Sequence, residues 1–207
     1  MPRDASETRA RLLDEAERLF ATRGIYQSTV REITEAAGQR NTSALSYHFG
    51  SREGVLQAIL ARHGDPLDRE RARFLVEPIE EMATRDLVRA LLVPMAGQLG
   101  SAEGRNYLRI VAQLTDRFPA WRVPEFHPYL RRILEVLEDR AGGAEPSVRR
   151  ERVVNSILLL TAAMAERARA VEERLTLELR AEAFVSNLAD MIVGALEAPA
   201  ALPLLVR

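Results

Sequence analysis

Seven polar residues, with no acid among them, crowd one short stretch of this sequence: Arg40, Asn41, Thr42, Ser43, Ser46, Tyr47 and His48. No acidic residue lies between Glu35 and Glu53. Hydroxyl groups both donate and accept hydrogen bonds, and an arginine guanidinium can pair with a guanine edge or a phosphate through two bonds. This composition favours hydrogen bonding to a nucleic acid.

The other reactive residues give little support to catalysis or metal binding. His48, His63 and His127 are far apart in the sequence and have no acid pair at ligand spacing, and the chain has no cysteine. The sequence also has no Ser/His/Asp arrangement, glycine-rich phosphate loop or paired-carboxylate motif. We therefore expect no enzymatic activity, no metal and no cofactor.

The residues before the polar stretch predict a helix that supports it. Thr29 and Glu32 have the spacing of a capping box, in which each side chain bonds the backbone N–H of the other residue. Apolar residues then recur at helical spacing: Val30, Ile33 and Ala37. Gly38 supplies a left-handed residue that can end the helix.

A second short helix is predicted after the turn at residues 39–41. Asn41 or Thr42 can cap it. Its apolar side consists of Ala44, Leu45 and Phe49, which leaves the polar residues on the opposite face. Such a helix fits the DNA major groove with its N-terminal residues nearest the base edges. Arg40 is the one nearby side chain able to make a bidentate pair with guanine.

Over about its first quarter, the sequence resembles the DNA-binding domain of the TetR (tetracycline-repressor-like) family of bacterial transcriptional regulators. The resemblance is carried by Ala37-Gly38 and by the run Leu45-Ser46-Tyr47-His48-Phe49-Gly50-Ser51-Arg52-Glu53. It implies that Thr29, Tyr47 and His48 contact backbone phosphates and that Arg52 adds charge at the next helix start. The residues alone also allow Tyr47 to be a partly buried core aromatic.

The rest of the chain is predicted to be helical, which gives an all-α fold. Helices are expected over 6–23, 51–74, 78–99, 104–118, 124–140, 147–174 and 176–197. Gly64 and Pro66 predict a kink or break near Asp65. We expect an N-terminal three-helix helix-turn-helix domain over 1–53. A larger C-terminal helical domain for ligand binding and dimerisation is expected over 54–207.

Two further sets of residues are candidates for binding in this larger domain. The candidate pocket residues are Met82, Leu91, Met95, Tyr107, Phe118, Trp121, Phe126 and Met164. Few charges lie near the aromatic residues of this set, which favours a mostly apolar ligand. The last two predicted helices carry apolar stripes with more surface than one bundle face requires. The candidate dimer residues on them are Val153, Ile157, Leu160, Phe184, Leu188 and Ile192.

The charge of the chain is the main objection to DNA binding. The net charge is −1, and residues 1–53 carry eight arginines and eight acids. Phosphate neutralisation supplies most non-specific affinity, so we expect weak non-specific binding and a modest salt dependence. The apolar runs are too short to span a bilayer, which predicts a cytoplasmic protein without a membrane partner.

Together, these observations and the resemblance favour a homodimeric repressor that leaves its double-stranded operator DNA when a small molecule binds. Two alternatives stay open. One is a DNA-binding regulator without a small-molecule effector, which a fully packed larger domain would favour. The other is a helical enzyme or ligand carrier with a vestigial helix-turn-helix.

Overall fold

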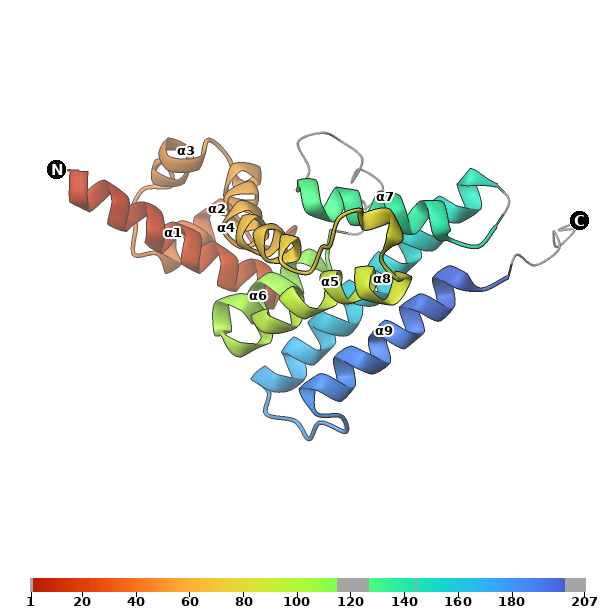
Figure 1. Cartoon of the computed structure of the whole chain (residues 1–207). Coiled ribbons are helices and arrows are strands. Elements are labelled where there is room, and N and C mark those ends of the chain that lie inside the picture. The colour runs from red at the N-terminus through yellow and green to blue at the C-terminus, as the bar shows by residue number, and fades with distance from the viewer. Residues whose placement is uncertain (1, 115–126, 144, 200–207) are drawn as a thin grey trace, which may run out of the picture.

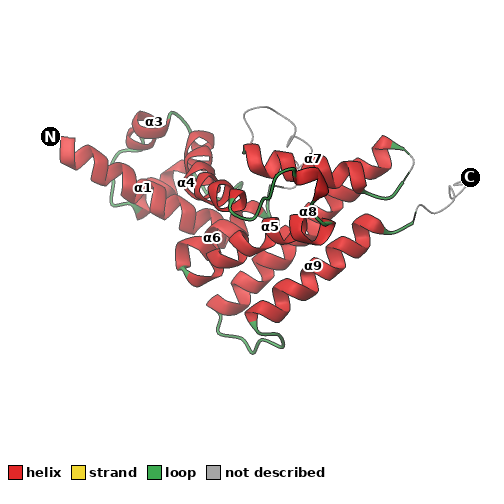
Figure 2. Cartoon of the chain, in the orientation of Figure 1, coloured by secondary structure: helices red, strands yellow, loops and turns green. Residues whose placement is uncertain are grey.

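The computed structural model describes residues 2–114, 127–143 and 145–199, and this part of the chain contains helices and loops without strands (Figures 1 and 2). The α-helices are α1 (Pro2–Arg23), α2 (Val30–Ala36), α3 (Ser43–Phe49), α4 (Arg52–Ala72), α5 (Thr84–Gly97), α6 (Ala102–Val111), α7 (Pro128–Arg140), α8 (Pro146–Glu172) and α9 (Ala181–Glu197). Two short 3₁₀ helices, η1 (Ile79–Glu81) and η2 (Gln98–Gly100), flank α5. The prediction of an all-α fold is confirmed.

Helices α1 to α3 and the first half of α4 share one apolar cluster. Phe20, Ile33, Leu45 and Ile59, one from each of these helices, have no exposed surface. At the turn after α2, Gly38 has φ +71° and the N–H of Gln39 donates to the carbonyl of Thr34 at 2.8 Å. The turn therefore fixes α3 against α1 and α2 in a helix-turn-helix, as predicted.

Helix α4 connects this unit to the larger one, and of the kink or break predicted near Asp65, the break does not occur. The helix runs without interruption from Arg52 to Ala72 with Pro66 inside it. Pro66 has no N–H to offer the carbonyl of Arg62, but both residues are exposed, so water can serve that carbonyl. Leu67 on the opposite side is buried and holds the helix against its neighbours.

The larger unit has a second apolar cluster, built mainly by α5, α7, α8 and α9, and α8 and α9 lie side by side (Figure 1). Some predicted bounds are wrong. The chain is extended at Met82 and Ala83, so α5 begins at Thr84 and not at 78. Helix α9 begins at Ala181, because the preceding segment from Leu175 is exposed and has no packing surface to stabilise a helix.

Two further predicted helices extend into residues outside the described part, and α6 ends before that part does, because residues 112–114 are not helical. Helix α6 ends at Val111, and the remainder of the helix predicted over 104–118 reaches residues outside the described part. Helix α7 begins at Pro128, and residues 124–126 of its predicted range also lie outside the described part. Among the described residues, no helix combines the length and the apolar character that crossing a membrane requires.

Candidate nucleic-acid interface and internal cavity

Helix α3 presents a hydroxyl-rich face to solvent. Ser43, Ser46 and Tyr47 are exposed, whereas Leu45 on the opposite side is fully buried. The Tyr47 side chain is 81% exposed, so the alternative that it is a core aromatic is wrong. His48 is half-buried between its neighbours, with ring centroids 5.0 Å from Tyr47 and 6.4 Å from Phe49. The exposed groups of α3 are therefore suited to hydrogen bonding with another molecule.

The turn before α3 settles which residue caps the helix. Asn41 Oδ1 accepts from the backbone N–H of Ser43 at 2.9 Å, whereas the Thr42 side chain makes no capping bond. The hydroxyl of Thr42 is thus left for a ligand at the N-terminal end of α3. Arg40 is exposed in the same turn and has no ion-pair partner within the described residues.

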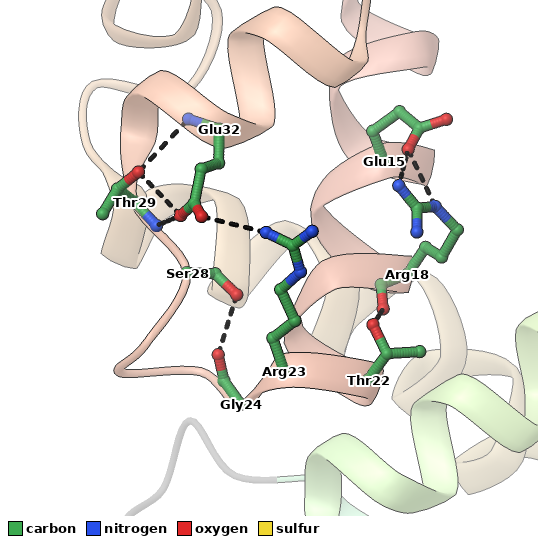
Figure 3. A network of polar contacts seen from close by, with 8 residues as sticks. All are labelled: Glu15, Arg18, Thr22, Arg23, Gly24, Ser28, Thr29 and Glu32. Carbon is green, nitrogen blue, oxygen red and sulfur yellow. Dashed lines mark hydrogen bonds and ion pairs between the residues drawn. The ribbon is translucent and has the colours of Figure 1, made fainter.

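Thr29 and Glu32 form the predicted capping box at the start of α2 (Figure 3). Glu32 Oε2 accepts from the Thr29 N–H at 2.8 Å, and Thr29 Oγ1 accepts from the Glu32 N–H at 3.2 Å. Arg23 donates to the other carboxylate oxygen of Glu32 at 2.9 Å. Hydrogen bonds from the Thr29 backbone and side chain lower the pKa of Glu32. The capping interaction is therefore present above the ordinary pKa of a glutamate and is lost as the pH falls through the lowered value.

We expect Thr29→Ala to lower the free energy of unfolding by about 0.5–2 kcal/mol, because the first turn of α2 loses its hydroxyl acceptor. Chemical denaturation followed by circular dichroism measures the change. Thr29→Ser keeps the hydroxyl and should stay close to wild type. An equal loss in both variants would show that the threonine methyl, and not the cap, is what stabilises this site.

Arg52 is directed toward the loop between α1 and α2. Its Nη1 donates to the carbonyl of Ile25, and its guanidinium lies 5.9 Å from the centroid of the Tyr26 ring. The residue therefore braces this loop while remaining half-buried at the start of α4. Its predicted contribution to DNA binding stays a prediction.

The acids of the N-terminal unit are largely neutralised by partners away from α3. Four acids on α1 and α2 lie within 2.9 Å of an arginine in the pairs Asp14–Arg62, Glu15–Arg18, Glu32–Arg23 and Glu35–Arg31. A fifth, Glu17, is buried and bonds His63. Residues 1–53 carry as many acids as arginines. Because five of these acids pair elsewhere, the charge of Arg40 beside α3 is not compensated by an ion pair within the described residues.

A cavity of about 170 Å³ lies in the larger unit, beside α4. It is lined by Leu60, Arg71, Leu91, Met95, Tyr107, Val111, Leu114, His127, Leu130, Leu134, Ile157, Leu160 and Thr161. The lining includes the predicted pocket residues Leu91, Met95 and Tyr107, but not Met82 or Met164, which pack in or against the core. Phe118, Trp121 and Phe126 lie outside the described residues.

Arg71 is a buried cation in the cavity wall, with 4% of its surface exposed. Its Nη1 lies 3.4 Å from Asp68 Oδ1, and its Nε has no hydrogen-bond partner in the described part of the chain. The Asp68 carboxylate also accepts from the N–H groups of Tyr129 at 3.1 Å and Leu130 at 2.8 Å, which caps the start of α7. Burial lowers the pKa of Arg71, yet an arginine stays protonated in proteins.

Two other polar side chains of the cavity are uncharged at neutral pH. Burial raises the pKa of the Tyr107 phenol, which therefore keeps its proton. Burial lowers the pKa of His127 below the ordinary value of a histidine. Arg71 is thus the source of positive charge among the residues that line the cavity.

Two sets of contacts join this cavity to the N-terminal unit. Tyr107 stacks on His63 with ring centroids 4.8 Å apart, and His63 Nε2 lies 3.0 Å from Glu17 Oε2 on α1. Gln113, which follows α6, accepts from the N–H of Ile25 at 2.9 Å and donates to the carbonyl of Phe20 at 3.0 Å. These partners come from distant segments, so no periodicity or motif in the sequence could indicate them.

Most of the candidate dimer residues are buried against other residues of the same chain. Val153, Leu160, Leu188 and Ile192 are buried in the core of the larger unit, whereas Ile157 and Phe184 are half-buried. The outward face of α9 carries Ala183, Asn187, Met191 and Gly194, all exposed. Their spacing of three and four marks one face of a helix. None of these four residues is among the candidate dimer residues.

Comparison of the sequence with known proteins matches a limited part of the chain. Residues 12–59 match the family described as "Bacterial regulatory proteins, tetR family". The HTH-type transcriptional regulator TtgR of Pseudomonas putida is 39% identical over 57 residues, which are 28% of this chain and 27% of that protein. The HTH-type transcriptional repressor KstR2 of Rhodococcus jostii is 38% identical over 79 residues, or 38% of each chain. The chain thus matches only about a quarter to two fifths of the length of these relatives.

Solved structures resemble nearly the whole chain. NalD of Pseudomonas aeruginosa, described as the secondary repressor of the MexAB-OprM multidrug efflux pump, has a TM-score of 0.57 at 19% identity, covering 94% of this chain and 98% of NalD. A tetR family regulator from Shewanella has a TM-score of 0.55 at 12% identity, covering 91% of this chain and 97% of that one. At these identities the likeness concerns the fold.

Proposed function

We propose that this protein, which belongs to the TetR family of bacterial regulatory proteins, is a dimeric repressor that releases its operator DNA when a small molecule binds. The exposed, acid-free face of α3 carries the proposal. Relatives described as repressors, such as KstR2 and NalD, support this direction of regulation.

Helix α3 fits the role of the recognition helix. Thr42, Ser43 and Ser46 offer hydroxyls to base edges in the major groove, and Arg40 offers a bidentate pair to guanine. We assign Tyr47, His48 and Thr29 as phosphate contacts, which would position the helix without reading sequence. Asn41 orients the first turn through its cap.

The cavity supports a small-molecule effector over the alternative of a regulator without one, because the larger unit is not fully packed. Its wall includes Tyr107 on α6 and Leu114, which directly follows Gln113, and Gln113 holds the end of α6 against α1. A ligand that moves α6 would therefore pull on the backbone at the end of α1. In a two-fold dimer such a movement changes the separation of two α3 helices that must match half-sites about 34–36 Å apart.

We place the two-fold contact on the outward face of α9. Small residues there allow close approach of two helices, and a Cβ added at Gly194 would meet no described atom of the same chain within 4 Å. Met191, 50% exposed, provides apolar surface at the centre of the face. The buried residues of α8 and α9 then support this face from behind.

We expect Met191→Glu to weaken dimerisation at least tenfold, because the two-fold axis brings two unpaired carboxylates into an apolar contact. Sedimentation equilibrium measures the dissociation constant. Tyr129→Glu, which adds the same charge on the exposed surface of α7, serves as the control. Unchanged dimerisation of Met191→Glu would place the interface elsewhere.

Selection of duplexes from a random DNA pool tests the proposed function without assuming an operator sequence. The full chain should enrich a sequence with two half-sites related by two-fold symmetry. Arg40→Ala should fail to enrich the same sequence. A pool that does not converge, with wild-type protein that is folded and dimeric, would refute sequence-specific DNA binding.

A further inference from the structure

The cavity contains a buried cation whose hydrogen-bonding capacity is largely unused. Of the five N–H donors of a guanidinium, those of Arg71 have one hydrogen-bonded partner among the described residues, Asp68. That contact is long, at 3.4 Å, and Nε has no partner among the same residues. Because a buried donor without a partner is costly, the site is incomplete as it stands.

Asp68 does not cancel the charge of Arg71. Its two carboxylate oxygens already accept from the N–H groups of Tyr129 and Leu130, at the positive end of the α7 dipole. Among the described residues, Asp65 also lies close to this region. It is directed to His127, with 3.6 Å between Oδ1 and Nδ1, and its side chain is 57% exposed. Because the Asp68 carboxylate is shared between the N-terminus of α7 and the Arg71 guanidinium, the cavity keeps a net positive charge.

The remaining wall limits the size and polarity of a ligand. Leucine, methionine, valine and isoleucine side chains provide most of it, and Thr161 directs its hydroxyl to its own helix, at 2.9 Å from the carbonyl of Ile157. A cavity of about 150 Å³ holds a benzene ring, and this one measures about 170 Å³. The Tyr107 phenol is a second donor in the same cavity.

We infer that the effector is a small organic acid, whose carboxylate pairs with Arg71 while its aromatic or short aliphatic body fills the apolar cavity. This inference rests on the proposed function and replaces a mostly apolar ligand with an amphiphilic anion. Arginine binds carboxylates through two parallel N–H bonds, and the low polarity of the cavity strengthens the pair.

Matched acids and amides test the inference by isothermal titration calorimetry on the full chain without DNA. The probes are benzoate, phenylacetate and hexanoate, each with its amide, which has nearly the same shape and no charge. At least one acid should bind at one site per chain and at least tenfold more tightly than its amide. Equal affinities within every pair, or no binding of any acid, would overturn the inference.

Variants locate the binding site. Arg71→Met should remove the preference for the acid over its amide. Arg71→Lys keeps a positive charge and should retain part of this preference, so it serves as a control should Arg71→Met fail to fold. Arg132→Met, on the exposed face of α7, should bind like wild type. A preference that survives in a folded Arg71→Met protein would contradict the assignment. If no acid preference is found, a converged DNA selection would still support the proposed function. If the DNA pool does not converge, the proposed function is refuted whether or not an acid binds.

Discussion

Asp68→Ala is expected to lower the free energy of unfolding by about 3–5 kcal/mol, the range for removing one partner of a buried ion pair. The substitution leaves Arg71, 4% exposed, without its counter-charge. It also removes the acceptor of two backbone N–H groups at the start of α7. Urea denaturation followed by circular dichroism measures the loss.

Two further variants separate these causes. Asp68→Asn keeps an acceptor for α7 but removes the charge, so its loss should be smaller than that of Asp68→Ala. Glu80→Ala breaks an exposed pair with Arg132 and should cost at most about 1 kcal/mol. An Asp68→Ala protein as stable as Glu80→Ala would mean that solvent reaches Arg71 readily.

Arg40→Ala is expected to weaken binding to the selected duplex by about 1–3 kcal/mol, the value of one bidentate arginine–guanine pair. This corresponds to roughly 5- to 150-fold in the dissociation constant. Fluorescence anisotropy with the selected duplex and a scrambled duplex of the same composition measures both affinities. Arg89→Ala, an exposed arginine of α5, is the matched control. Equal weakening on both duplexes would make Arg40 a phosphate contact instead.

The helix-turn-helix could be predicted closely because its signals are local. The capping box at Thr29 and the left-handed Gly38 are each decided within a few residues, and both occur where predicted. The apolar spacing of Ala44, Leu45 and Phe49 likewise identified the polar face of α3. The sequence does not decide the exposure of Tyr47, because a single aromatic residue on a short helix fits either face.

The cavity and its connections could not be predicted, because they depend on residues brought together from distant segments. Arg71 had a local signal, since it follows Leu67 by four residues on the buried side of α4, where a charge is unusual. Its pairing with Asp68 at a spacing of three was equally visible. The sequence does not indicate that the start of α7 packs against Asp68, where the Asp68 carboxylate caps that helix. Pro66 does not end α4 for a related reason, because its effect depends on which side of the helix faces solvent.

Footprinting on the DNA upstream of the protein's own gene, with unrelated DNA as competitor and salt varied, is the decisive experiment for operator binding by a two-fold dimer. We expect symmetric protection of a near-palindrome, with half-sites about one helical turn apart or a multiple of it. Competitor DNA should leave this protection intact, while rising salt should weaken it modestly. A folded dimer that protects no upstream sequence in preference to competitor, even at low salt, would contradict operator binding.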